Sequence, residues 1–188
     1  MGAATALAAT AAIPARATVF APPALLPRAM AALNAHAGAI PVRDRIIIAD
    51  YGSPSRSPRF DLVNVANGSF RSLLVSHGRG SDPDHNGWVD RFSNAPGSNA
   101  SSEGAYAAAA EYVGKHGRSR RLIGLDPSNN NAEPRAIVVH SAWYVSPDMV
   151  RQHGKLGRSE GCFAVSEQDL ASVMDWLTPG TLLFSGKA

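Results

Sequence analysis

Two apolar segments joined by a tight turn constrain the fold more than any other feature of the chain. Residues 60–66 (FDLVNVA) alternate between apolar and polar side chains, and residues 70–76 (FRSLLVS) form a second apolar segment. Asn67-Gly68 lies between them, and this dipeptide is compatible with a type I′ turn, in which both central residues have positive φ. The pattern predicts an antiparallel β-hairpin.

Further strands and a few helices follow from the spacing of apolar residues. Four more segments have the length and composition of strands: residues 45–51, 120–125, 135–145 and 181–185. Three segments have the apolar spacing of helices: residues 22–37, 105–116 and 166–177. Ser166 and Asp169 resemble a capping box at the start of the last helix. We therefore predict a mainly β fold with short helices, an α+β arrangement without internal repeats.

The composition describes one globular domain with many loops. The chain has 188 residues, of which 45% are hydrophobic and 18% charged, and it contains 17 Gly and 13 Pro. This length can bury a sizeable core. The net charge is +3, and the densest basic cluster is Lys115, Arg118, Arg120 and Arg121. Because no aromatic residues are interleaved with this cluster, the pattern disfavours nucleic acid as a partner.

Residues 1–17 (MGAATALAATAAIPARA) have the small-residue character of a secretory signal. Ala15-Arg16-Ala17 resembles a cleavage site, although the positively charged start of such a signal is missing. The stretch is too short and too weakly hydrophobic for a transmembrane helix. We interpret it as a truncated signal peptide whose true start lies upstream, with an N-terminal tail as the alternative. Residues 18–44 then form a helical extension, and residues 45–188 form the main domain.

A long polar segment, residues 77–106, follows the predicted hairpin and is expected to line a cleft. Its first half carries calcium-like ligands, Asp82, Asp84 and Asn86. However, the twelfth position of that pattern is Ser93 instead of a bidentate Glu. A zinc site with His77 and His85 is a further alternative, although the spacing matches no standard zinc pattern. Neither metal is favoured.

Cys162 is the only cysteine in the chain, so it cannot form an intramolecular disulfide. A lone thiol is either a small buried hydrophobe or a nucleophile. Gly157 and Gly161 on its N-terminal side indicate a tightly turning loop, whereas Phe163 starts an apolar run. The sulfur is therefore expected where a loop enters the protein, beside exposed backbone N–H groups. This setting favours the interpretation of Cys162 as a nucleophile, and the interpretation as a buried hydrophobic residue stays open.

A histidine in the second half of the chain is a candidate base. His140 lies near the end of a predicted strand, and Ser159-x-Gly161-Cys162 comes about twenty residues later. A Cys–His pair is an arrangement used in nucleophilic catalysis. On this signature, VVHSAWYV followed by GRSEGCFAV, the chain resembles the YkuD-like L,D-transpeptidase catalytic domain. Over residues 45–184, the segments VSHGRGS, RFSNAPGS, SSEGAY, YVGKHG, RLIGLDP and RAIVVH are similar to its murein L,D-transpeptidase branch.

The resemblance implies a β-sandwich fold with an accessory N-terminal helix, and a role for each residue of the signature. Cys162 matches the nucleophile, and His140 matches the general base that accepts the thiol proton. Gly161 matches the small residue whose backbone helps to form the oxyanion hole with the Cys162 N–H. Ser159 matches the hydroxyl that supports the loop and the substrate. In this family a backbone carbonyl usually orients the histidine.

The resemblance also implies an activity. L,D-transpeptidases of this kind form a thioester with a peptidoglycan tetrapeptide stem, release the terminal D-Ala and transfer the acyl group to an amine, without a cofactor. The implied location is the periplasm or cell envelope, and no membrane span is expected. Two alternatives stay open. One is an L,D-carboxypeptidase, in which water resolves the thioester, and the other is a non-catalytic peptidoglycan-binding envelope module.

Some positions depart from the family pattern close to the cysteine. Ser141 follows the predicted base, where the family often has Gly. Glu160 precedes the glycine of the signature, and its carboxylate is expected to raise the pKa of the Cys162 thiol unless Arg158 compensates. Phe163 stands where the family usually has Arg or Asn, and it is expected to pack in the core.

Because Phe163 cannot bind a carboxylate, another cation must hold the carboxylate of the substrate. Three arginines are candidates: Arg158, Arg79 and Arg135. Two further residues are candidates for the substrate side of the cleft, His77 and Gly104, and a structural role is the alternative for His77. The two remaining histidines of this half of the chain, His116 and His153, are expected at the surface.

Overall fold

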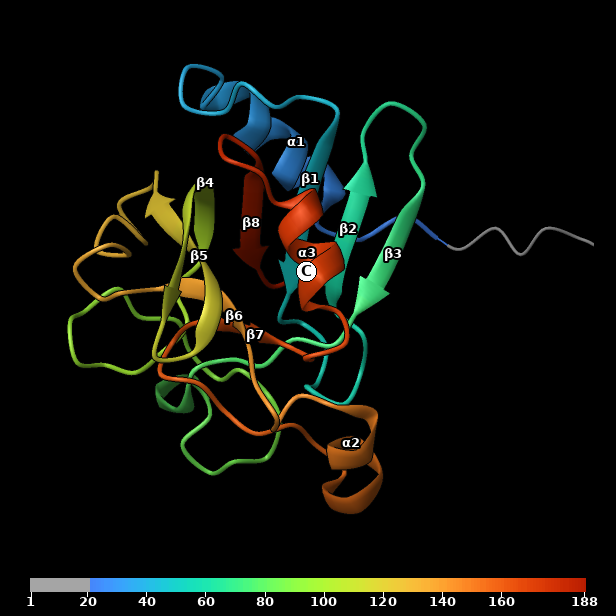
Figure 1. Ribbon diagram of the computed structural model, residues 1–188, viewed down its shortest axis with the longest axis vertical. Coiled ribbons are helices and arrows are strands. Elements are labelled where there is room, and N and C mark those ends of the chain that lie inside the picture. The colour runs from blue at the N-terminus through green and yellow to red at the C-terminus, as the bar shows by residue number, and fades with distance from the viewer. Residues whose placement is uncertain (1–20) are drawn as a thin grey trace, which may run out of the picture.

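The computed structural model describes residues 21–188 and shows a strongly β structure with three short helices (Figure 1). The strands are β1 (Arg45–Asp50), β2 (Phe60–Asn64), β3 (Phe70–Leu73), β4 (Gly104–Gly114), β5 (Gly117–Gly124), β6 (Val138–Ser141), β7 (Phe163–Val165) and β8 (Leu182–Gly186). The helices are α1 (Leu26–Ala35), α2 (Pro147–His153) and α3 (Leu170–Trp176), and a 3-10 turn covers Arg79–Ser81.

All the strands belong to one sheet that folds back on itself. Their order is β3-β2-β1-β8-β4-β5-β6-β7, with parallel pairs at β1–β8 and β6–β7 and antiparallel pairs elsewhere. β2 and β7 are far apart in this order, yet the rings of Phe60 and Phe163 lie 6.4 Å apart. After β3, the Ser76 N–H donates to the Ala164 carbonyl at 2.9 Å. The two ends of the sheet therefore meet around a shared core, which confirms the predicted fold class.

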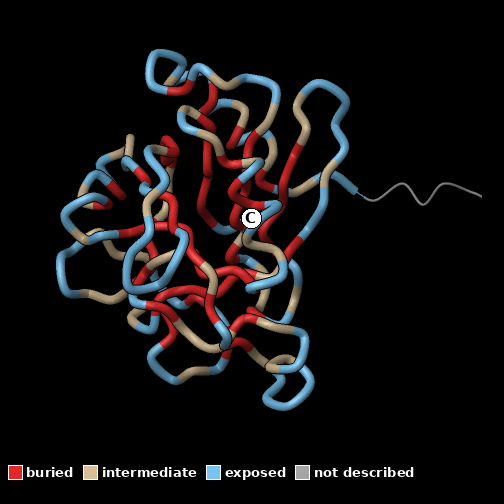
Figure 2. Tube along the Cα trace, viewed as in Figure 1, coloured by how far each residue is buried: buried red, intermediate tan, exposed pale blue. Residues whose placement is uncertain are grey.

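Phe163 lies at the centre of this shared core. Its side chain has no exposed surface, and its ring contacts Tyr106 edge-on at 5.4 Å and stacks on Tyr51 at 6.4 Å. Figure 2 shows the buried parts of the trace in the interior of the molecule, with exposed loops around them. The expectation that Phe163 packs in the core is confirmed. Phe163, the residue next to Cys162, is thus held in the core, and its position determines where β7 begins.

Helix α1 covers the other face of the sheet. Pro27 occupies its first turn, where a missing N–H costs nothing. The helix buries Ala29 and Leu33 against alternate residues of β1, Ile46 and Ile48, while Ile47 points into the shared core. The predicted helix over residues 22–37 is confirmed with shorter bounds, and it packs on the main body.

The predicted hairpin is confirmed, but its turn is not the predicted one. β2 and β3 pair from Phe60 with Leu73 to Val63 with Phe70. Of the two turn residues, only Gly68 has positive φ. The Asn64 side chain accepts hydrogen bonds from the N–H groups of residues 66 and 67, which lengthens the connection to a five-residue loop.

The prediction of a helix over residues 105–116 is wrong. This segment is the long strand β4, which pairs with β5 on one side and β8 on the other. Alanine favours a helix by less than about 1 kcal/mol per residue, and tertiary pairing outweighs that preference. Tyr106 faces the shared core while Ala105 and Ala107 face α1, so both sides of the strand are buried. A turn at residues 115–116 connects β4 to β5.

The second half of the chain shows two further differences. β6 is shorter than the strand predicted for residues 135–145, because the residues before Val138 and after Ser141 lie in turns. Helix α2 was not predicted, although the sequence carries its signals. Ser146 caps it by accepting the Met149 N–H at 3.2 Å, and Gly154 ends it in the left-handed conformation.

The other strand predictions and the last helix are confirmed as β1, β5, β8 and α3. The predicted signal peptide, residues 1–17, lies outside the described residues. Within residues 21–188, every helix is too short or too polar to cross a membrane.

We expect Phe163→Ala to lower the free energy of unfolding by about 3–5 kcal/mol, since it removes a fully buried ring from the shared core. Urea unfolding followed by circular dichroism measures the change. Phe163→Leu is the control, because it keeps an apolar side chain and should destabilise less. Equal stability of wild type and Phe163→Ala would contradict this account of the core.

Candidate active site

Cys162 and His140 line the same cavity, which has a volume of about 420 Å³. Its walls come from four parts of the chain. The β4–β5 hairpin contributes Tyr112, Lys115 and His116; the start of β6 and the segment before it contribute Arg135, Ala136 and Val138; the segment after β6 contributes Tyr144; and the loop before β7 contributes Arg158, Ser159 and Glu160. Residues far apart in the sequence therefore meet around the Cys162 sulfur and the His140 imidazole.

The orientation of His140 is set by the main chain. Its Nδ1 lies 2.8 Å from the Ser141 carbonyl oxygen and donates to it, which leaves Nε2 as the nitrogen with a free lone pair. The ring of His116 stacks on it with centroids 4.3 Å apart. Burial lowers the pKa of His140, the bond to Ser141 opposes this, and the charges of His116 and Lys115 lower the pKa further. The imidazole is therefore neutral at neutral pH.

Cys162 lies directly before β7, so its position is tied to the core through Phe163. Its Sγ is 3.5 Å from the Ala136 carbonyl oxygen. Burial raises the pKa of the thiol, and the carboxylate of Glu160 raises it further. The Val138 N–H and the charges of Lys115 and Arg135 act in the opposite direction. The thiol is therefore protonated at rest.

Ser159 holds the loop that leads to Cys162. Its hydroxyl donates to the Cys162 carbonyl at 2.7 Å and accepts the Gly161 N–H at 3.1 Å. The hydroxyl thus closes a small ring of hydrogen bonds within the loop. The Gly161 N–H, which the sequence suggested for an oxyanion hole, has Ser159 Oγ as its acceptor here.

Gly161 is required by the backbone at this point. Its φ is +116°, a conformation that L side chains rarely adopt. A Cβ at this position would lie 2.7 Å from the Ala100 carbonyl oxygen and 2.9 Å from Ile137. The wall opposite Gly161 is also strained, since Ala136 has a φ of +53°. The loop is therefore packed closely between two other segments.

Segment 77–79 anchors Ser159 from the other side. The Ser159 N–H donates to the His77 carbonyl at 2.9 Å, and the Arg79 N–H donates to the Ser159 carbonyl at 2.8 Å. These two bonds form a parallel bridge between Gly78 and Ser159. The position of the cysteine loop therefore depends on how segment 77–79 is fixed.

A buried network of three side chains fixes that segment. Arg59 donates to His77 Nδ1 at 2.7 Å, and His77 Nε2 donates to Asp82 at 3.0 Å. Only 1% of His77 is exposed. Burial, followed by the charge of Arg59, lowers the pKa of His77 to about 4, so the ring stays neutral between its two partners. His77 lies behind the cavity and is not part of its lining.

The same network accounts for the calcium-like sequence. The carboxylate of Asp82 accepts the N–H groups of Asn86 and Gly87 at 2.8 and 2.9 Å as well as His77. Its oxygens thus close a turn of the main chain. In the part of the chain that the structure describes, no three His, Cys, Asp or Glu residues gather as a metal site would require.

The predicted carboxylate-binding arginines differ in their positions. Arg158 lines the cavity, but its guanidinium donates to the carbonyls of Asp82 and Pro83. These hydrogen bonds engage the Arg158 guanidinium. Glu160 pairs with Arg79 and not with Arg158, which the sequence analysis had considered as the residue that offsets its charge. Arg79 is not part of the cavity lining, but it pairs with Glu160, which is, at 3.0 Å, and both side chains are more than half exposed.

Arg135 lines the cavity and supports the wall opposite Cys162. It donates to the carbonyls of Ser93 and Ala100 at 2.8 and 2.5 Å. Gly104 starts β4 with a φ of +114° and is not part of the cavity lining. A Cβ there would lie 2.6 Å from the carboxylate of Asp126, so this glycine serves the backbone.

The sequence analysis missed the contribution of the β4–β5 hairpin. His116 is exposed, as expected, but its ring also stacks on that of His140, which the sequence did not indicate. Tyr112 and Lys115 line the cavity from the same hairpin, and Tyr144 lines it from the segment after β6. The closely spaced Gly114 and Gly117 were the available signal, since such glycines also suit a hairpin turn.

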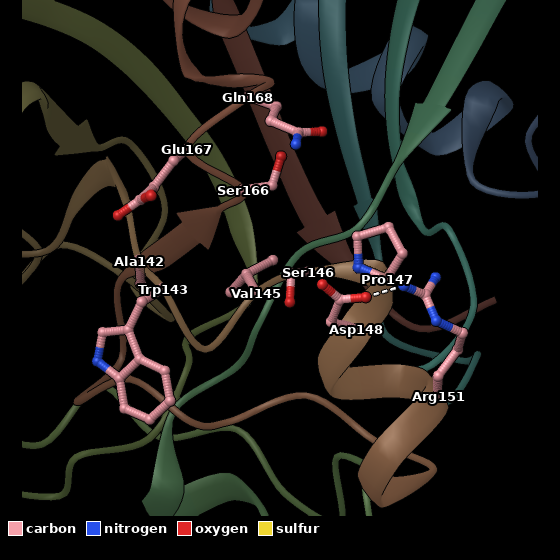
Figure 3. A pocket seen from close by; sticks show the side chains of 10 residues that line it. All are labelled: Ala142, Trp143, Val145, Ser146, Pro147, Asp148, Arg151, Ser166, Glu167 and Gln168. Atoms are coloured by element: carbon pink, nitrogen blue, oxygen red, sulfur yellow. Dashed lines mark ion pairs between the residues drawn. The ribbon is translucent and has the colours of Figure 1, made fainter.

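A second, smaller cavity of about 260 Å³ lies between α2 and the turn before α3 (Figure 3). Its lining includes Trp143, Ser146, Ser166 and an Asp148–Arg151 ion pair. Tyr144, next to Trp143, lines the cavity of Cys162 and His140 instead. The segment after β6 therefore separates the two cavities.

Comparison with known proteins gives the family. The family of L,D-transpeptidase catalytic domains matches residues 21–185, and the chain therefore belongs to it. L,D-transpeptidases act on the peptidoglycan of the cell wall, outside the cytoplasm. No curated protein matches the chain.

Several solved structures are similar to part of this chain. An L,D-transpeptidase from Mycobacterium smegmatis is 16% identical, with a TM-score of 0.45 over 76% of this chain and 58% of that one. LdtMt1 in complex with imipenem is 17% identical, with a TM-score of 0.44 over 76% and 59%. An L,D-transpeptidase from Mycobacterium tuberculosis H37Rv is 14% identical, with a TM-score of 0.48 over 77% and 58%. The matched region spans less than two thirds of these proteins.

The buried histidine predicts a pH dependence of stability. Because the pKa of His77 is about 4 in the folded protein and about 6.5 when unfolded, only the unfolded chain gains a proton between these values. Stability is therefore fully present above pH 6.5 and falls by up to about 3 kcal/mol as the pH drops to 4. Urea unfolding at several pH values measures this.

His77→Gln is the comparison, since glutamine can bond to both partners without titrating. We expect a shallower loss of stability between pH 6.5 and 4 in this variant. His140 also has a lowered pKa, so its own contribution to the loss of stability at low pH remains in both proteins. An unchanged slope in His77→Gln would contradict the role of the network.

Proposed function

We propose that this protein is a cysteine-dependent L,D-transpeptidase that acts on peptidoglycan stem peptides in cell-wall crosslinking or remodelling. The observation that carries the proposal is that Cys162 and His140 line one cavity, with His140 Nδ1 bonded to a main-chain carbonyl and Nε2 left to accept a proton. Membership of the L,D-transpeptidase family supports the reaction class.

In the first half of the proposed reaction, the Cys162 sulfur attacks the carbonyl carbon before the terminal D-Ala. His140 Nε2 takes the proton from Cys162 Sγ as the sulfur–carbon bond forms. The carbonyl oxygen becomes negatively charged, and the Cys162 N–H is the proposed donor to it, worth about 3 kcal/mol for one such bond. The Gly161 N–H would have to leave Ser159 to contribute. The imidazolium then protonates the amine of D-Ala, which leaves as the carbon–nitrogen bond breaks.

In the second half, an amine of another stem attacks the thioester. His140 accepts a proton from this amine, and the thiol is released when the new amide forms. Water can take the place of the amine, and the product is then a free tripeptide acid, as in an L,D-carboxypeptidase. Since such a reaction takes place at the cell wall, we also propose that the protein is exported to the periplasm or cell envelope.

A covalent adduct tests the nucleophile directly. We expect a carbapenem to add its full mass to the wild-type protein and nothing to Cys162→Ala, as measured by intact-protein mass spectrometry. His140→Gln should slow the adduct by about 100- to 10,000-fold, the range typical for loss of a general base. Equal addition to wild type and Cys162→Ala, or none to either, would favour a non-catalytic peptidoglycan-binding module.

Incubation with tetrapeptide stems separates the two enzyme reactions. Crosslinked dimers identify a transpeptidase, whereas tripeptide alone identifies a carboxypeptidase. Cys162→Ala is the control in both assays and should give neither product. Turnover by this variant would contradict the proposed thioester.

The raised pKa of the thiol predicts an alkaline rate profile. Burial and Glu160 both raise the pKa of Cys162. The rate of alkylation by iodoacetamide should therefore still be increasing at pH values above the pKa of an ordinary thiol. Glu160→Gln removes one of these causes, so its profile should move to lower pH and its rate at pH 7 should increase. Glu167→Gln removes the same charge outside the cavity of Cys162 and His140 and should leave the profile unchanged. A shift of the Glu160→Gln profile to higher pH would contradict the assignment.

A further inference from the structure

We infer that Lys115 forms a carboxylate-binding subsite at the tip of the β4–β5 hairpin, and that this subsite binds the free carboxylate at the D-Ala end of the donor peptide. The inference rests on the function proposed above, since it identifies what holds one end of that substrate. It also assigns a role to a hairpin that sequence analysis interpreted as the end of a helix.

The geometry brings Lys115 to the reacting pair. It occupies the turn between Gly114 and Gly117, which face each other across the hairpin, and it lines the cavity that contains Cys162. Its neighbour His116 stacks on His140 with centroids 4.3 Å apart and ring planes 21° apart. The charge of Lys115 lowers the pKa of both reacting groups, which agrees with a position close to each.

The other cations of the cavity are already engaged by the protein. Arg158 donates to main-chain carbonyls of residues 82–83, and Arg135 donates to carbonyl and hydroxyl oxygens of residues 93–102. Neither guanidinium is free to turn to a ligand without losing these bonds. Among residues 21–188, by contrast, no ion pair or side-chain hydrogen bond includes the Lys115 ammonium. Lys115 is the cation that a bound anion can reach.

The chemistry of the donor peptide gives the ligand. The carboxylate of the terminal D-Ala is one residue away from the carbonyl that reacts, a separation of about 3.8 Å between consecutive Cα atoms. A cation that binds it must therefore belong to the same cavity as the thiol. Glu160 lines the cavity as well, and it is already paired with Arg79 at 3.0 Å. This ion pair leaves Lys115 as the cation of the cavity that can receive the carboxylate of the D-Ala end.

Binding to an inactive form of the protein tests the subsite apart from turnover. In Cys162→Ala, the dissociation constants of a tetrapeptide stem and of its C-terminal amide are measured by calorimetry. We expect the acid to bind about tenfold more tightly than the amide, as is typical of a hydrogen bond between charged groups. Adding Lys115→Met should remove this preference, and adding Lys115→Arg should retain most of it.

Arg118→Met is the matched control. Arg118 is an exposed cation of the same hairpin that pairs with Glu111 and does not line the cavity. Its removal changes the net charge equally and should keep the preference for the acid. A preference that persists in Lys115→Met, or its absence from the Cys162→Ala parent, would overturn the subsite.

Failure of the proposed function gives a different result. If the wild-type protein forms neither a carbapenem adduct nor a product, but the Lys115-dependent preference for the acid is present in the binding assay, the subsite stands and the activity does not. If the wild-type protein turns over the acid and the amide equally well and Lys115→Met has no effect on kcat/KM, the activity stands and the subsite does not.

Discussion

The cysteine loop depends on two main-chain hydrogen bonds between Ser159 and the segment after β3. That segment is held in turn by the buried Arg59–His77–Asp82 network, in which a neutral imidazole bonds to a guanidinium on one side and a carboxylate on the other. Removing one member of such a network leaves a buried charge without a partner, which costs several kcal/mol. The support is therefore rigid, and it lies outside the cavity of Cys162 and His140 itself.

Burial has a second effect at the site, because it keeps the proposed nucleophile and the proposed base uncharged. The pKa of Cys162 is raised and that of His140 is lowered, so the thiol and the imidazole are neutral together at neutral pH. Such a pair differs from a cysteine whose pKa is strongly depressed by a nearby cation. In the proposed reaction, proton transfer is coupled to attack on the substrate, and the nearby charges of Lys115 and Glu160 adjust how readily it occurs.

The sequence alone predicted the strands that bury continuous apolar runs, and it paired His140 with Cys162 through their spacing and family resemblance. It failed where local preference and tertiary pairing disagree. The alanines of β4 favour a helix locally, but two neighbouring strands and α1 bury both faces of the segment as a strand. That one error hid the hairpin that brings Lys115 and His116 to the cavity.

The chemistry-bearing residues and their order were thus determined by the sequence itself. Gly161 is an example, since its positive φ agrees with what a glycine at that position suggests. Only the tertiary structure decided which cations remain available to a ligand, and that the buried His77 supports the cysteine loop. Arg158 and Arg135 were candidates for binding the substrate carboxylate, and each bonds instead to protein atoms from distant parts of the chain. For His77 a substrate-side and a structural role were both open, and its bonds to Arg59 and Asp82 favour the structural one. The physical reason is that hydrogen-bond partners are set by the folding of the sheet on itself, which no local pattern encodes.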